Sequence, residues 1–144
     1  MRIAVLTDIH GNREAFAAVL ADVAGHGVDR LAILGDIVGY GGDPEWCCDT
    51  TARLVRDGAL CVRGNHDNAA AGAPEAMSSL ARAAIDWTKD RLDAGQKVFL
   101  AGLPLSHEEG DVLFVHASAN DPGAWSYVTS DTRAAPSFRA TKAR

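Results

Sequence analysis

The sequence has few cysteines and no long apolar run. Its three cysteines, Cys47, Cys48 and Cys61, include an adjacent pair, so they do not provide a disulfide framework and they fit a reducing compartment. We interpret them as small buried apolar residues. No apolar run approaches the roughly 20 residues that a membrane-spanning helix needs, and the N-terminus lacks the charged and then apolar arrangement of a signal peptide. We therefore expect a cytoplasmic protein with no membrane partner.

The sequence also lacks an excess of basic residues. Its 14 Lys and Arg residues stand against 19 Asp and Glu residues, which gives a formal net charge of -5 at pH 7. Surfaces that bind nucleic acid broadly are basic, so this charge argues against a long nucleic acid as the partner. We expect a small substrate instead.

Three short aliphatic runs alternate with amphipathic stretches in the first half of the chain. The predicted strands span residues 2–7, 30–35 and 60–63. Between them, apolar residues recur at helical spacing after the helix N-cap Asn12 and after the pair Asp43-Pro44. This alternation predicts an α/β fold with a parallel sheet, right-handed crossovers and flanking helices. A chain of 144 residues is long enough for one domain, which we place at residues 1–144.

The second half of the chain is less regular. Apolar spacing predicts a long helix over residues 77–92 and a short helix over residues 98–103. Residues 111–118 have the composition of a strand that returns from a hairpin. We interpret the Ala- and Gly-rich residues 65–74 as a flexible loop. Within it, Asp67 and Asn68 are interpreted as turn residues with a minor supporting role.

Polar side chains gather where the predicted strands end. They are Asp8, His10, Asp36, Asn65, His66 and His116. The carboxyl ends of strands in an open α/β sheet meet at one edge, and ligands bind there. A single Asp after a strand is more often a turn residue or a helix cap. Asp, Asn and His gathered together at one edge predict a functional site.

Carboxylates, imidazoles and an amide oxygen make a mixed donor set of oxygen and nitrogen. Such a set suits divalent first-row metals such as Mn, Fe, Co, Ni or Zn better than Ca or Mg. A bridging carboxylate can hold two ions ~3.5–4 Å apart, where they stabilise both the attacking and the leaving oxygen of a phosphoryl displacement. Such ions also lower the pKa of a shared water. The donor set therefore predicts hydrolysis of a phosphoester.

Four motifs, in order, carry a resemblance to a known family. They are DIHGN at residues 8–12, GDIVGYGGDP at 35–44, GNHD at 64–67 and FVHAS at 114–118. Together they resemble the motifs of the calcineurin-like metallophosphoesterase superfamily, and the second is similar to the form found in its small bacterial phosphodiesterase branch. The resemblance extends to about Asp131. It implies that family's sandwich, with a mixed, mostly parallel sheet flanked by helices.

The resemblance also implies which residues bind two metal ions. It implies that Asp8 and His10 bind the first ion and that Asp36 bridges both. Asn65 and His116 would bind the second. The ions implied are divalent transition metals, with Mn²⁺ in first place and Fe, Zn, Ni or Co as alternatives.

In this scheme His66 is a catalytic residue and not a ligand. It would protonate the leaving alkoxide or stabilise charge on the phosphoryl oxygens. The implied activity is that of a metal-dependent phosphodiesterase, with a phosphomonoester as an alternative. The implied substrate is a small phosphoester or a nucleotide-like molecule. Gly11, Gly35 and Gly64 would allow the sharp turns and close packing that the site needs.

The sequence departs from the family pattern in two respects. Gly39 and Tyr40 stand where protein phosphatases have an Asp-Arg pair, whose Asp steadies the catalytic His, and this disfavours a protein phosphatase. The sequence also reaches Arg144 with no His after His116. We therefore expect a C-terminally shortened domain that lacks the family's Gly-His-x-His motif and part of its second sheet.

These departures leave several alternatives. The shortened chain could keep a site of weak metal affinity, take the absent ligands from another subunit, or have lost activity and serve as a scaffold or binding module of the same fold. His66 favours the enzyme, because a scaffold does not need it. A repair-type nuclease is a third alternative. An incomplete sheet would leave apolar strand surface uncovered, which predicts a homo-oligomer that covers it.

Overall fold

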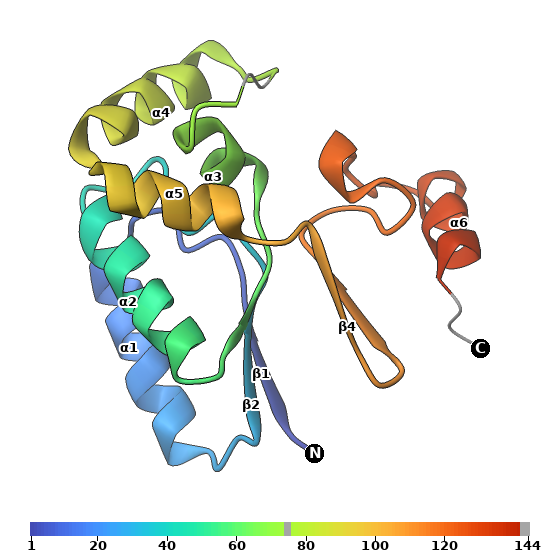
Figure 1. Ribbon diagram of the computed structural model, residues 1–144. Helices are drawn as coiled ribbons and strands as arrows, with labels where there is room; N and C mark the ends of the chain where they lie inside the picture. Colours follow the sequence, from blue (N-terminus) through green and yellow to red (C-terminus); the bar gives the residue numbers. More distant parts are fainter. Residues whose placement is uncertain (74–75, 142–144) are drawn as a thin grey trace.

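The computed structural model describes residues 1–73 and 76–141 (Figure 1). Strands and helices alternate in its first half, in the order β1 (Ile3–Leu6), α1 (Arg13–Gly25), β2 (Arg30–Ile33), α2 (Pro44–Arg56) and β3 (Leu60–Cys61). Its second half contains α3 (Asn65–Ala70), α4 (Ser79–Arg91), α5 (Ala94–Gly102), β4 (Ser106–Glu109), β5 (Val112–Val115), the short 3-10 helix η1 (Pro122–Ala124) and α6 (Asp131–Ala140). The predicted α/β fold is confirmed.

The first three strands form a parallel sheet in the order β1-β2-β3. β1 pairs with β2 from Ile3 opposite Arg30 to Leu6 opposite Ile33, and Ile33 in turn lies opposite Cys61 of β3. Right-handed crossovers that step a sheet in one direction place their helices on one face. Accordingly, α1 and α2 lie on the same side of the sheet, and the β4–β5 hairpin lies on the other (Figure 1).

Two apolar clusters pack against the two faces of this sheet. The larger one lies under the helices and includes the fully buried Ile33 and Leu100. The smaller one joins Ala32 and Val62 of the sheet region to Phe114 of β5. Burying a Phe side chain contributes about 1.5–3 kcal/mol, so Phe114 is the main apolar anchor that holds the hairpin against the sheet.

Side-chain caps set where several helices begin. Asn12 caps α1 as predicted, because its side chain accepts a hydrogen bond from the backbone N–H of Ala15 at 3.0 Å. Helix α5 begins at Ala94, four residues before the predicted residue 98. The reason is a reciprocal capping box, in which Asp93 accepts from the backbone N–H of Gln96 at 2.8 Å and Gln96 accepts from that of Asp93 at 3.1 Å.

The prediction of a loop over residues 65–74 is wrong for its first six residues, which form helix α3. The side chain of Asp67 accepts a hydrogen bond from the backbone N–H of Gly64 at 3.0 Å, and Ala69 and Ala70 are buried in the main core. A capped first turn and two buried alanines stabilise a helix that composition alone does not indicate. Residue 74 lies outside the described residues.

The predicted hairpin is confirmed as a separate two-stranded antiparallel sheet, β4 with β5. Gly110 forms its turn with φ +59, a conformation that favours glycine.

The three cysteines are buried and free. Burial raises the pKa of the Cys47 and Cys48 thiols to about 12, which keeps them protonated. No helix in the described parts of the chain is long and apolar enough to cross a membrane.

Candidate metal centre

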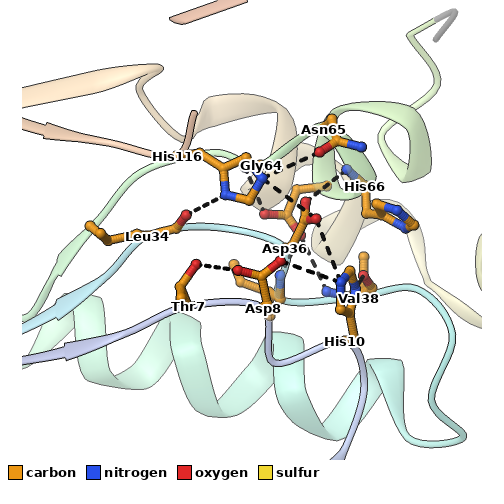
Figure 2. Close-up of polar contacts among 12 residues, drawn as sticks. Thr7, Asp8, His10, Leu34, Asp36, Val38, Gly64, Asn65, His66 and His116 are labelled. Atoms are coloured by element: carbon orange, nitrogen blue, oxygen red, sulfur yellow. Dashed lines mark hydrogen bonds and ion pairs between the residues drawn. The ribbon is translucent and has the colours of Figure 1, made fainter. Parts of the chain in front are cut away.

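The loops that follow β1 and β2 are joined to each other by backbone hydrogen bonds. The N–H of Asp8 donates to the Gly35 carbonyl at 3.1 Å, and the N–H of His10 donates to the Asp36 carbonyl at 2.8 Å. Asp8, His10 and Asp36 have φ values of 56, 50 and 52, which is an uncommon left-handed conformation for residues other than glycine. The paired loops hold this conformation and direct the three side chains to one place (Figure 2).

Asp36 occupies the centre of the site. Its Oδ2 lies 3.6 Å from Nε2 of His10 and 3.5 Å from Nε2 of His116. Nε2 of His10 also lies 3.6 Å from Oδ1 of Asp8. On the other side, Nε2 of His116 lies 3.2 Å from Oδ1 of Asn65. The structure thus brings all five predicted ligands together around one carboxylate (Figure 2).

The second ring nitrogen of each histidine fixes which atom faces the centre. Nδ1 of His116 lies 2.6 Å from the carbonyl of Leu34, and Nδ1 of His10 lies 3.2 Å from the carbonyl of Val38. A carbonyl can only accept, so each Nδ1 carries a proton, and each Nε2 presents a lone pair when its ring is neutral. A backbone carbonyl behind a histidine ring is the usual arrangement of a metal-binding histidine.

Lone pairs therefore converge at two neighbouring points. Nε2 of His10 faces carboxylate oxygens of Asp8 and Asp36 at distances too long for a hydrogen bond. Nε2 of His116 lies 3.5 Å from Oδ2 of Asp36 and 3.2 Å from the amide oxygen of Asn65, and the second distance is within hydrogen-bond range. When both rings are neutral, acceptors face acceptors and repel unless a cation lies among them, so the residues present fit a divalent ion at each point. The donors of Asp8, Asp36 and His116 all lie within 4.8 Å of one another, as do those of His10, Asp36 and His66.

The Asp36 carboxyl is almost completely buried, at 3% exposure. Burial raises its pKa from 3.8 to about 6, although His116 and a hydrogen bond from the backbone N–H of His66 at 2.9 Å favour the charged form. Asp8 is half-exposed and accepts a hydrogen bond from the Thr7 hydroxyl at 2.6 Å. A buried carboxylate without a cation is costly, which again favours a positive ion beside Asp36.

His66, the predicted catalytic residue, lies at the edge of this cluster. Its ring centroid is 4.7 Å from that of His10 and 4.7 Å from that of Tyr40. Burial, together with smaller effects of positive charge on His10 and His116, lowers the pKa of His66 from 6.5 to about 4. Within residues 1–73 and 76–141, the buried Nδ1 of His66 has no hydrogen-bond partner.

Asp67 supports the site more extensively than the minor role predicted from the sequence. It is fully buried, and its Oδ1 accepts from the backbone N–H groups of Ile37 at 2.8 Å and Val38 at 3.2 Å. Its Oδ2 accepts from the N–H of Gly64 at 3.0 Å. The carboxylate therefore ties the loop after β2 to the start of α3. An Asp in the first turn of a helix is a common capping residue, but the prediction of a loop over residues 65–74 left no helix for Asp67 to cap.

Two glycines allow these segments to meet. A Cβ at Gly35 would overlap the backbone of Gly64, and a Cβ at Gly64 would overlap Oδ1 of Asp36. Gly35 also has φ +86. The predicted need for close packing at both positions is confirmed.

Beside the site, a cavity of about 500 Å³ is lined by Asp8, Ile9, His10, Gly11, Asn12, Glu14, Tyr40, Gly41, Gly42 and Asp43.

Comparison with known proteins finds relatives of both sequence and structure. The family model of the calcineurin-like phosphoesterases matches residues 1–139. An uncharacterized protein of Methanocaldococcus jannaschii is 40% identical over 136 residues, which cover 90% of this chain and 54% of that protein. A metallophosphoesterase structure from Sphaerobacter thermophilus is 39% identical with a TM-score of 0.81, and the match covers 99% of this chain and 56% of that one.

A further solved structure, assigned provisionally as a diadenosine tetraphosphatase, is 25% identical with a TM-score of 0.65. The match covers 83% of this chain and 51% of that one. The chain thus spans about half the length of each of these relatives.

Proposed function

The chain belongs to the calcineurin-like phosphoesterase family, and we propose that it hydrolyses phosphodiester bonds at a site for two divalent transition-metal ions. The observation that carries the proposal is the sharing of Asp36. One carboxylate oxygen lies 3.6 Å from Nε2 of His10 and 3.5 Å from Nε2 of His116. A shared carboxylate between two sets of donors is what a bridging ligand requires.

Each remaining donor has a place in this proposal. Asp8 and His10 would join Asp36 at one ion, and Asn65 and His116 would join it at the other. Mixed oxygen and nitrogen donors support Mn²⁺ first, with Fe, Zn, Ni or Co as alternatives. When bound, two such ions activate water as a nucleophile near neutral pH and neutralise charge on phosphoryl oxygens.

His66 would give a proton to the leaving oxygen or donate a hydrogen bond to the phosphoryl group. Its ring is neutral near pH 7 in the structure, because burial lowers its pKa to about 4. A phosphate beside the ring adds negative charge, which favours the protonated form and offsets that lowering. The residue at position 39 is glycine, so no carboxylate from this position steadies the ring, which supports a phosphodiesterase over a protein phosphatase.

The substrate class that we propose is a small phosphodiester, including nucleotide-like molecules. The relative assigned provisionally as a diadenosine tetraphosphatase supports a nucleotide-like substrate. The cavity beside the site also bears on the choice. Besides the proposed ligand Asp8, its lining includes the acidic residues Glu14 and Asp43, which disfavour a substrate with several further phosphate groups on that side.

The test is hydrolysis of bis(p-nitrophenyl) phosphate by the purified chain with added Mn²⁺, together with Mn²⁺ binding measured by calorimetry. We expect activity that depends on Mn²⁺ and that Asp36→Asn abolishes. Asp86→Asn makes the same change at an exposed position of α4 and should leave activity unchanged. Failure of the folded chain to bind Mn²⁺ at millimolar concentration would refute the proposal, and binding without turnover would favour the scaffold.

A further inference from the structure

The ring of His66 is not held in place by a hydrogen bond at Nδ1. This nitrogen is buried, and it has no partner among the residues that the structure describes. It faces Gly39, and a Cβ added at Gly39 would lie only 2.5 Å from Nδ1. The rotation of the imidazole about its χ2 angle must therefore be set by the surfaces that touch the ring.

Two of those surfaces are aromatic. The Tyr40 ring lies 4.7 Å from the His66 ring at an angle of 46°, and the His10 ring lies 4.7 Å from it at 72°. Tyr40 and His10 also meet each other, at 4.8 Å and 73°. The three rings thus form a closed set, within the distances at which aromatic pairs attract. His10 is fixed in this set, because its Nδ1 bonds the carbonyl of Val38.

The backbone around Tyr40 is built to present the ring there. Tyr40 has φ +63, an unfavourable conformation for an aromatic residue, and Gly39 before it has φ +94. The N–H of Gly41 then donates to the carbonyl of His10 at 2.8 Å, which ties the turn to the loop after β1. Despite this constraint, Tyr40 is 52% exposed. Strain at a residue that gains little burial points to a functional constraint and not to a core role.

We infer that Tyr40 is a positioning residue, which holds the His66 ring in its working orientation by packing instead of by a hydrogen bond. This inference rests on the proposed function, because it concerns the residue assigned there to the leaving group. The half-exposed ring also lines the cavity beside Asp8 and His10. Tyr40 therefore stands at the boundary between His66 and the space open to substrate.

The first arm of the test measures kcat and KM for bis(p-nitrophenyl) phosphate at saturating Mn²⁺. Tyr40→Phe keeps the ring and should stay within about twofold of the unmodified chain. Tyr40→Ala removes two aromatic contacts and should lower kcat by about tenfold with little change in KM. Tyr127→Ala, at a residue 76% exposed, is the matched control and should change neither constant.

The second arm does not depend on turnover. In the metal-free chain, the proton resonances of the His66 ring, assigned with His66→Gln, should be displaced by the facing rings. They should stay displaced in Tyr40→Phe and move toward the values of an exposed histidine in Tyr40→Ala.

Three results would overturn the inference. They are an unchanged His66 spectrum in Tyr40→Ala, equal kcat values for Tyr40→Ala and the unmodified chain, and a Tyr40→Phe variant as slow as Tyr40→Ala, which would assign the effect to the hydroxyl. An inactive unmodified chain would instead count against the proposed function, and the spectra would still decide whether Tyr40 orients His66.

Discussion

Replacing Asp67 by alanine should destabilise the folded chain more than any change on its surface. The carboxylate accepts three backbone hydrogen bonds, from Ile37, Val38 and Gly64. In Asp67→Ala all three N–H groups lose their acceptor in a part of the structure that water does not reach. Each buried donor left without a partner costs about 1–3 kcal/mol. We therefore expect a loss of about 3–9 kcal/mol, which is a large part of the ~5–15 kcal/mol that stabilises a typical domain.

Asp67→Asn separates the hydrogen bonds from the shape of the side chain. The amide oxygen can still accept from Ile37 and Val38, but the amide NH₂ group then faces the N–H of Gly64. One donor loses its partner, so the expected loss is about 1–3 kcal/mol. Urea denaturation at about pH 8 measures both values, since burial and the neighbouring Asp36 raise the pKa of Asp67 to about 7 and the carboxylate is ionised above it.

The same change should reach the metal site through the backbone. Val38, whose N–H Asp67 holds, is also the residue whose carbonyl fixes His10. Mn²⁺ affinity should therefore fall in both variants, and further in Asp67→Ala. Asp86→Asn on α4 serves as the control. A urea midpoint for Asp67→Ala within experimental error of the unmodified chain, at an unchanged m-value, would show that the three bonds do not carry the stability assigned to them.

Two further predictions concern the centre of the site. Burial raises the pKa of Asp36 to about 6, and a metal ligand must lose its proton, so Mn²⁺ affinity should rise as pH increases through 6. The raised pKa also means that the metal-free folded state binds more protons than the unfolded state between about pH 4 and 6. Its stability should fall as pH rises through that window, and Asp36→Asn should reduce the slope. Gly64→Ala should lower Mn²⁺ affinity at least about tenfold, because its Cβ would overlap the Asp36 carboxylate; Gly25→Ala, where a Cβ meets nothing within 4 Å, should leave it unchanged.

The sequence was sufficient to predict the strands and the residues gathered at their ends. β1 and β2 are short aliphatic runs, and a parallel sheet aligns whatever follows them. Asp8 and Asp36 therefore had to lie close together once the fold class was known. The ligand roles themselves remain predictions, which metal binding by the variants would test.

Helix α3 and the contacts of Tyr40 could not be predicted in the same way. Helix α3 has six residues, too few for periodicity to be read, and it depends on the burial of Ala69 and Ala70 in the core. The Tyr40 ring meets His66, which lies 26 positions further along the chain. Neither a buried alanine nor a contact at that separation leaves a local pattern in the sequence.

The left-handed backbone at Asp8, His10 and Asp36 limits how this site can vary. Aspartate, asparagine and histidine tolerate that conformation better than other residues with side chains. At these three positions, a residue suited to the metal is therefore also a residue suited to the backbone. Asp36→Glu would keep the charge but place a longer, less tolerant residue in the same conformation, so similarity of charge is a poor guide to substitution here. A library directed at this site should offer Asp, Asn, His and Gly first.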